Sequence, residues 1–342
     1  MQTVLYIIVT LLVFGILILA HEAGHFFVAK ACKVKVNEFS IGMGPAIFKK
    51  QGKETLYSIR ALPIGGFVQM DGEDGEGTDV NSFNKKPYWK RFLILVTGAL
   101  MNILLGFILI CIINSMAKAL PTTTVADFDS DAVSNSCGLQ ENDKILKINN
   151  YGVNSYLDIT YGLATSGTDP VTVTVERDGE TVVLNDVSFP VIEDESLGEC
   201  FTLDFRVFGK RRSFVSTVKY SFDWTVSISK SIYSFFGTLF TGRADLNQVS
   251  GPVGTTTAIG QSVQLGLDSL LLVVALISIN LGIVNLLPFP ALDGGRILFL
   301  AIEAVRRKPM NQKVEVAFNA VGLILLLGLM AVITVKDIIH LF

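Results

Sequence analysis

The sequence has little charge: 17% of its 342 residues are Asp, Glu, Lys or Arg, whereas half are hydrophobic. Its mean hydropathy of +0.50 is above the range usual for soluble domains, so the composition favours a membrane protein. The net charge of −3 and the lack of aromatic residues clustered with basic ones argue against nucleic acid as a partner.

Cysteine is also scarce. The four cysteines, Cys32, Cys111, Cys137 and Cys200, include no C-x-x-C pair, which argues against a cysteine-based zinc site or redox motif. Cys137 and Cys200 could form a disulfide if both face an oxidising space. The alternative is that both remain unpaired thiols.

Four long stretches carry no charge: Met1–Ala20, Phe92–Ala117, Ser269–Leu292 and Val316–Val335. Each has about the 20 residues that a helix needs to cross a bilayer. No Lys or Arg precedes the first stretch. The basic residues that begin a signal peptide are therefore missing, which favours a transmembrane helix over a signal peptide. A fifth uncharged stretch, Leu246–Leu267, is rich in Gly, Ser, Thr and Gln, and we expect it to be a loop.

Lys and Arg gather in the connections between spans one and two and between spans three and four. The positive-inside rule therefore predicts that both connections are cytoplasmic. The N-terminus, the segment 118–268 and the C-terminus are then expected outside the cytoplasm.

The segment between spans two and three is soluble in character. Asp143–Asn149 and Val171–Arg177 are rich in β-branched residues, and Asp178-Gly179 favours a tight turn into Glu180–Leu184. These patterns predict a small α/β or mostly β module at about residues 122–192.

The following segment contains an apolar residue at every fourth position, namely Phe214, Val218 and Phe222. This spacing predicts an amphipathic helix within Lys210–Thr241. Such a helix could lie on the outer membrane surface, or it could pack on the module as an ordinary surface helix.

The end of span one reads His21-Glu22-Ala23-Gly24-His25. Two histidines four residues apart lie one helical turn above each other, so both rings can bind one ion. This is the H-E-x-x-H arrangement of zinc hydrolases, in which the glutamate faces the metal-bound water. Ionisable residues at membrane depth also suggest function. The alternative is that these residues form the wet rim of the span.

A catalytic zinc ion usually takes three protein ligands. The remaining histidine, His340, lies at the far end of span four, so Asp293 is the better candidate. It follows Pro288 and Pro290, which we expect to break the helix, and broken backbone at membrane depth lines a wet cavity or is buried in protein. Asp293 could instead be a turn residue at the membrane interface.

The pairing of HEAGH with Asn285–Gly294 (NLLPFPALDG) resembles the site-2 protease family of intramembrane zinc metalloproteases. The similarity is closest to the bacterial regulated-intramembrane-proteolysis type, which has four spans and a single PDZ domain. This resemblance implies Zn²⁺ as the cofactor. The residues that match the family's site are the ligands His21, His25 and Asp293, the catalytic Glu22, and the motif residues Asn285, Pro288 and Pro290.

Shorter elements extend the resemblance over nearly the whole chain. Gly65-Gly66-Phe67 is similar to a substrate-binding β-loop, and Gly98–Asn102 to a G-P-x-x-N element in which Ala99 replaces the proline. Ser250–Gly254 (SGPVG) matches the segment before span three. Cys137-Gly138-Leu139-Gln140 resembles the carboxylate-binding region of a PDZ domain, which makes Gly138 and Leu139 candidate substrate contacts.

The expected reaction is peptide-bond hydrolysis within or next to transmembrane segments. Glu22 would take a proton from zinc-bound water and deliver it to the leaving nitrogen. Asn102 or Asn285 could hydrogen-bond the developing oxyanion, or could instead join the spans. A substrate helix must unwind, and Thr55–Met70 is the candidate strand edge to which it would add.

Expected substrates are single-pass membrane proteins or peptides, such as anti-sigma factors or remnant signal peptides, surrounded by membrane lipid. The module would select among them. The alternatives are a non-catalytic membrane PDZ scaffold and a membrane zinc hydrolase of non-peptide substrates.

The predicted fold is a polytopic α-helical cell-membrane protein with four transmembrane helices, a small membrane-associated β-loop and an extracytoplasmic PDZ-like α/β domain, with the active site near the cytoplasmic side. The predicted segments are helix one with HEAGH (1–29), a cytoplasmic loop and β-loop (30–91), helix two (92–117), the PDZ-like domain (118–192), a linker with the amphipathic helix (193–268), helix three (269–292), a cytoplasmic loop (293–315) and helix four (316–335).

Overall fold

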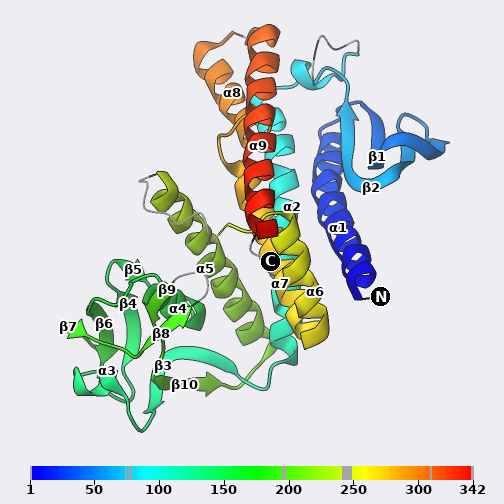
Figure 1. Cartoon of the computed structure of the whole chain (residues 1–342). Coiled ribbons are helices and arrows are strands. Elements are labelled where there is room, and N and C mark those ends of the chain that lie inside the picture. The colour runs from blue at the N-terminus through cyan, green and yellow to red at the C-terminus, as the bar shows by residue number, and fades with distance from the viewer. Residues whose placement is uncertain are drawn as a thin grey trace. The chain divides into compact units, whose positions relative to one another are not determined.

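A computed structural model of the chain describes residues 2–73, 75, 77, 79–194, 198–240, 249–308 and 310–339. The chain forms two compact units, one of residues 1–109 and 250–342 and one of residues 110–249. Figure 1 shows the elements of both units.

Among the described residues, four helices are long and apolar enough to cross a membrane, which confirms that the four predicted stretches form helices that could span it. They are α1 (Gln2–Ala31), α2 (Tyr88–Met116), α7 (Leu267–Leu286) and α9 (Gln312–Ile339). Helix α7 ends just before Pro288 and Pro290, as predicted, because proline lacks the N–H that would continue the helical hydrogen bonds.

The predicted loop Leu246–Leu267 is wrong over its described part, which forms helix α6 (Pro252–Leu265). Pro252 begins the helix, at a position where its missing N–H costs nothing. Small residues then let α6 approach α1 closely: Ile259 is fully buried, and a Cβ on Gly260 would lie 2.5 Å from the Tyr6 ring. This part of the predicted linker therefore belongs to the first unit.

The predicted loop 293–315 also contains a helix, α8 (Asp293–Arg306). Its apolar face buries Phe299 and Leu300, and the Phe299 ring packs against Phe318 of α9 with centroids 4.8 Å apart. The buried Glu303 of α8 pairs with Arg91 at the start of α2 at 2.8 Å. These contacts order a segment that its charged residues had marked as a loop.

Between α1 and α2 the chain forms a sheet of β1 (Val36–Gln51) and β2 (Leu56–Met70), followed by a short 3-10 helix at Phe83–Lys85. Residues 38–41 of β1 pair with β2 on both sides, with residues 56–59 on one side and 66–69 on the other. The segment Gly66–Met70 is therefore an edge of this sheet among the described residues. Gly66 runs beside α1, where a Cβ would lie 3.5 Å from Glu22.

The second unit is an α/β module around a six-stranded antiparallel sheet with the order β10-β3-β4-β6-β7 and β5 paired to β4. The strands are β3 (Leu120–Phe128), β4 (Lys144–Ile148), β5 (Tyr151–Gly152), β6 (Val171–Arg177), β7 (Glu180–Val187) and β10 (Phe205–Lys210), and the short helices are α3 (Val133–Ser136) and α4 (Tyr156–Ala164). A separate hairpin is formed by β8 (Val191–Asp194) and β9 (Gly198–Phe201).

The strands predicted at Asp143–Asn149 and Val171–Arg177 are confirmed as β4 and β6. The tight turn is confirmed by the positive φ of Asp178 and Gly179. The predicted end of the module at residue 192 is too early, because β10 pairs with β3 as a part of the same sheet. Phe201 and Phe205 join its buried core.

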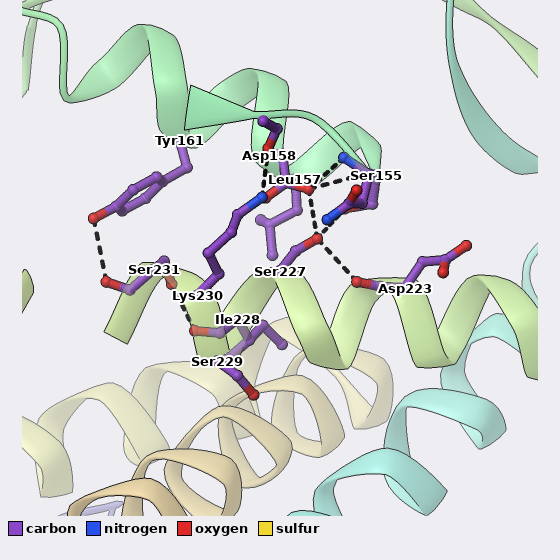
Figure 2. Close-up of polar contacts among 12 residues, drawn as sticks. Ser155, Leu157, Asp158, Tyr161, Asp223, Ser227, Ile228, Ser229, Lys230 and Ser231 are labelled. Carbon is purple, nitrogen blue, oxygen red and sulfur yellow. Dashed lines mark hydrogen bonds and ion pairs between the residues drawn. The ribbon is translucent and has the colours of Figure 1, made fainter. Parts of the chain in front are cut away.

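Helix α5 (Phe214–Phe240) confirms the predicted helix and packs on α4 through a buried polar network (Figure 2). The fully buried Asp158 accepts hydrogen bonds from the backbone N–H of Ser155 and from the Ser227 hydroxyl, and Lys230 lies 2.9 Å from its other oxygen. A buried carboxylate needs such partners. On another face of α5, Ser221 accepts a hydrogen bond from Asn114 in α2 at 3.0 Å.

Candidate metal centre and active site

The three predicted metal ligands meet at one point in the first unit. His21 Nε2 lies 3.1 Å from His25 Nε2 and 3.1 Å from Asp293 Oδ2, and His25 Nε2 lies 3.4 Å from the same Asp293 oxygen. Their side chains are largely enclosed, with 12%, 9% and 18% of their surfaces exposed for His21, His25 and Asp293. Residues from α1 and α8 thus converge although 268 positions separate His25 from Asp293.

These three distances fit a tetrahedral metal site. Zinc–ligand bonds of about 2.0–2.2 Å place two ligand atoms of a tetrahedron roughly 3.3–3.6 Å apart. Asp293 Oδ2 is buried and has no hydrogen-bond partner among the described residues, which is costly for a carboxylate unless a cation lies beside it. Two imidazoles and one carboxylate are also a ligand set of catalytic zinc sites.

His25 is held in the tautomer that metal binding requires. Its Nδ1 lies 2.8 Å from the Ile94 carbonyl, and because a carbonyl can only accept, Nδ1 carries the proton and Nε2 is left with a lone pair. Gly98 of α2 provides the room for both rings, since a Cβ there would lie 2.3 Å from His25 Nε2 and 2.9 Å from His21 Cε1.

Asp293 is placed by the turn that the two prolines produce. It is the first residue of α8, where a negative charge interacts favourably with the helix dipole. Gly294 and Gly295 let the turn fold back on itself, because a Cβ on either would lie within 2.5 Å of a backbone oxygen of Leu287 or Phe289.

Glu22 lines a cavity of about 520 Å³ together with the three candidate ligands. The edge strand also borders this cavity, through Phe67, Val68, Gln69 and Met70. The site therefore combines a metal-ligand set, a carboxylate suited to proton transfer and a strand edge in one chamber.

Two ion pairs at the cavity were not predicted from the sequence. Arg60 lies over the Phe67 ring at 4.9 Å and binds Glu38 at 2.7 Å, and Glu73 pairs with Arg296, one turn after Asp293. Partial burial would raise the pKa of Glu38, but hydrogen bonds from Ser58 and Arg60 hold it below its usual range. No local motif marks these residues, because each pair joins segments far apart in the sequence.

The predicted supporting residues differ in their placement. Asn102 is fully buried with its amide 3.4 Å from the His21 ring. Asn285 is half buried in the last turn of α7 and does not line the cavity. Pro288 and Pro290 form the turn before Asp293, and Gly65 takes a positive φ before the edge strand. His340 lies outside the described residues.

The predicted substrate contacts in the module receive less support. The side chain of Leu139 is fully buried in the core of the module, and a substrate contact at this residue stays a prediction. The carbonyl of its neighbour Gly138 accepts a hydrogen bond from Arg177 at 2.9 Å, so this segment serves the fold. The structure shows no disulfide between Cys137 and Cys200.

Comparison with known proteins shows to which family the chain belongs. Residues 9–329 match Peptidase family M50. The chain belongs to Peptidase family M50. It is therefore a zinc-dependent metalloprotease and, with its four apolar helices, a multi-pass membrane protein.

Similar bacterial proteins match almost the whole length of this M50 peptidase. A Clostridium acetobutylicum protein provisionally named as a zinc metalloprotease is 35% identical over 334 residues, which cover 98% of this chain and 97% of the relative. A similarly named Clostridium perfringens protein is 37% identical over 336 residues, covering 98% and 99%. The Bacillus subtilis regulator of sigma-W protease RasP is 29% identical over 426 residues, covering 98% and 99%.

Proposed function

We propose that this M50 peptidase hydrolyses peptide bonds within or next to transmembrane segments of single-pass membrane proteins or peptides. The observation that carries the proposal is the position of the His21–His25–Asp293 set. His21 and His25 lie in the apolar helix α1, and Asp293 lies just after the apolar helix α7. A metal centre carried by such helices suits a substrate that is itself in the membrane.

The side chains around the centre have complementary roles in this proposal. His21, His25 and Asp293 hold the zinc ion, which when bound polarises the scissile carbonyl and acidifies a water molecule. Glu22 takes the proton of that water and passes it to the leaving nitrogen. The Ile94 carbonyl keeps the Nε2 lone pair of His25 directed at the metal position.

The edge strand Gly66–Met70 is the proposed binding site for the unwound substrate. A substrate helix loses its internal hydrogen bonds when it unwinds, and pairing with a strand edge replaces them. Phe67, Val68 and Gln69 border the same cavity as Glu22, so a segment added to this edge would pass the reacting centre. This refines the expected edge Thr55–Met70 to its second half. Residues 56–59 pair with β1 on both of their sides, with residues 38–41 and with residues 48–51, whereas residues 66–69 pair with it on one side only.

The second unit has the proposed role of a PDZ-like selection module outside the cytoplasm, as the basic residues in the other connections indicate. Helix α5 supports its attachment to the membrane surface: Phe214, Val218 and Phe222 are 85%, 37% and 60% exposed. The opposite side of the helix is held by α4, where the Ser227 hydroxyl donates to Asp158.

Membrane-bound regulators such as anti-sigma factors are the proposed substrate class, together with remnant signal peptides. The name of the Bacillus subtilis relative, a regulator of sigma-W protease, supports the first of these.

The test uses the full chain reconstituted in lipid vesicles with a panel of single-pass reporter proteins. We expect zinc-dependent cleavage, with mass spectrometry placing the cut inside or beside the reporter's transmembrane segment. Glu22→Gln should abolish cleavage while retaining zinc, and Glu141→Gln, at an exposed carboxyl of the second unit, should cleave like the wild type. Undiminished cleavage by Glu22→Gln would refute the assigned role. Cuts only in soluble regions would refute the intramembrane activity.

A further inference from the structure

The buried Asn102 of α2 is oriented toward one candidate zinc ligand. Its side-chain Nδ2 lies 3.4 Å from His21 Nδ1, and its Oδ1 is buried with no hydrogen-bond partner among the described residues. The backbone around it is fixed, since the Ser278 hydroxyl donates to the Asn102 carbonyl at 2.7 Å. A buried amide oxygen without a donor is unusual and calls for a physical explanation.

The tautomer of His21 supplies the missing donor. When His21 binds a metal through Nε2, its single proton must lie on Nδ1. An amide N–H directed at that proton would be repulsive. The two ends of an amide differ little in shape, so their assignment follows from the hydrogen bonds that they can make. Turning the amide by 180° places Oδ1 against Nδ1–H and gives both groups a partner.

We propose that Asn102 is a positioning residue for zinc, whose Oδ1 accepts a hydrogen bond from His21 Nδ1–H and thereby directs Nε2 at the metal. This inference rests on the zinc site of the proposed function. In this arrangement each histidine donates one hydrogen bond from its Nδ1–H group. His25 donates to the Ile94 backbone carbonyl, and His21 donates to the Asn102 side chain. Acceptors of this kind raise the affinity of a histidine for metal.

The position of Asn102 argues against the other role considered for it, a hydrogen bond to the oxyanion of the substrate. Its side chain is fully buried, and it does not line the cavity that Glu22 and the edge strand share. An oxyanion donor must reach the substrate itself. The two roles also require opposite ends of the amide, since an oxyanion needs the N–H group and His21 Nδ1–H needs the oxygen.

The first experiment measures the zinc dissociation constant of the detergent-purified chain by competition with a chromophoric chelator. We expect Asn102→Ala to bind zinc about 10–100-fold more weakly, the range found for such supporting residues. Asn102→Asp, which keeps an acceptor oxygen, should recover most of that affinity. Asn114→Ala is the matched control, because Asn114 is a buried asparagine of the same helix whose partner is Ser221, and it should bind zinc like the wild type.

Two results of this experiment would overturn the proposal. One is wild-type zinc affinity in Asn102→Ala together with a reduced kcat at saturating zinc, which would indicate a role toward the substrate. The other is an equal loss of zinc in Asn102→Ala and Asn102→Asp, which would indicate that the amide N–H or its packing is needed.

A second measurement needs no change at position 102 and stands if those variants fail to fold. Nitrogen-15 NMR of the zinc-loaded wild type with labelled histidine shows which ring nitrogen of His21 carries the proton. The His21 signals are assigned by comparison with the spectrum of His25→Gln. We expect the proton on Nδ1 and the metal on Nε2, and the reverse would refute the inference. A wild-type chain that binds no zinc would instead refute the proposed zinc site, so the two failures are distinguishable.

Discussion

Replacing Gly98 by alanine should disable the metal centre while leaving every candidate ligand in the sequence. A Cβ at this position would lie 2.3 Å from His25 Nε2, 2.6 Å from His25 Cε1 and 2.9 Å from His21 Cε1, whereas ordinary contacts begin at 3.4 Å. The rings must therefore move by the difference between 3.4 and 2.3 Å, or 1.1 Å. Metal–ligand distances tolerate only about 0.2 Å.

Neither helix can easily make room for the extra methyl group. A Cβ on Gly24 of α1 would already lie 2.6 Å from the Thr97 carbonyl of α2, so the two backbones are in close contact at this level. The displacement must fall on the imidazoles. A misplacement of about 1 Å at a reacting centre costs about 100-fold in rate, and we expect kcat/KM to fall at least that much and zinc affinity to fall with it.

The assay pairs a zinc-affinity measurement with cleavage of a membrane reporter, and the control is Gly106→Ala on the same helix. Its Cβ would lie 2.4 Å from Ile279 Cγ1, so it crowds the helix packing equally but touches no histidine. We expect Gly106→Ala to lower stability and to keep zinc. Wild-type zinc affinity in Gly98→Ala would refute the reasoning, and equal zinc loss in both variants would assign the effect to general helix separation.

Two further predictions concern α9 and α5. Asp337 in α9 accepts the backbone N–H groups of Gly251 and Gly254 at 2.9 and 2.8 Å; Asp337→Ala should therefore lower the free energy of unfolding by roughly 2 kcal/mol, and Asp337→Asn by less than half of that. Thermal unfolding of the purified chain measures both, and an unchanged Tm for Asp337→Ala would contradict the prediction. In α5, p-benzoylphenylalanine at Phe222 should crosslink to phospholipid in vesicles far more than at Asp223, about 100° further round the helix. Adducts between chains, or none at Phe222, would count against membrane contact.

Several elements could be predicted because their signals are local. The apolar runs predict the spans by length alone, and the β-branched segments with Asp178-Gly179 predict the β6–β7 hairpin. Helix α6 could not be predicted in this way. Its Gly, Ser and Thr residues are typical of loops, and it forms because they fit closely against α1 and because Asp337 caps it from another helix.

The candidate site likewise contains features that the sequence predicts and features that it does not. The spacing of His21 and His25 on a helix is sufficient to predict that both can face one ion, and the two prolines before Asp293 indicate a turn. The residues of α2 that contact the two histidine rings, Ile94 and Asn102, could not be predicted in this way. A contact between two helices produces no periodic pattern in the sequence of either one.

The sequence by itself determined the chemistry: which side chains can bind zinc, which carboxylate can move a proton, and that long apolar helices carry them. Those properties depend on residue type and on spacing within one element. Only the tertiary structure decided that Asp293 approaches the histidines to within 3.4 Å, that Gly98 makes room for their rings, and that Gly66–Met70 is an edge of its sheet, among the described residues, beside Glu22. These features depend on close packing between distant segments, which is governed by the complementary shapes of surfaces that meet only in the folded chain.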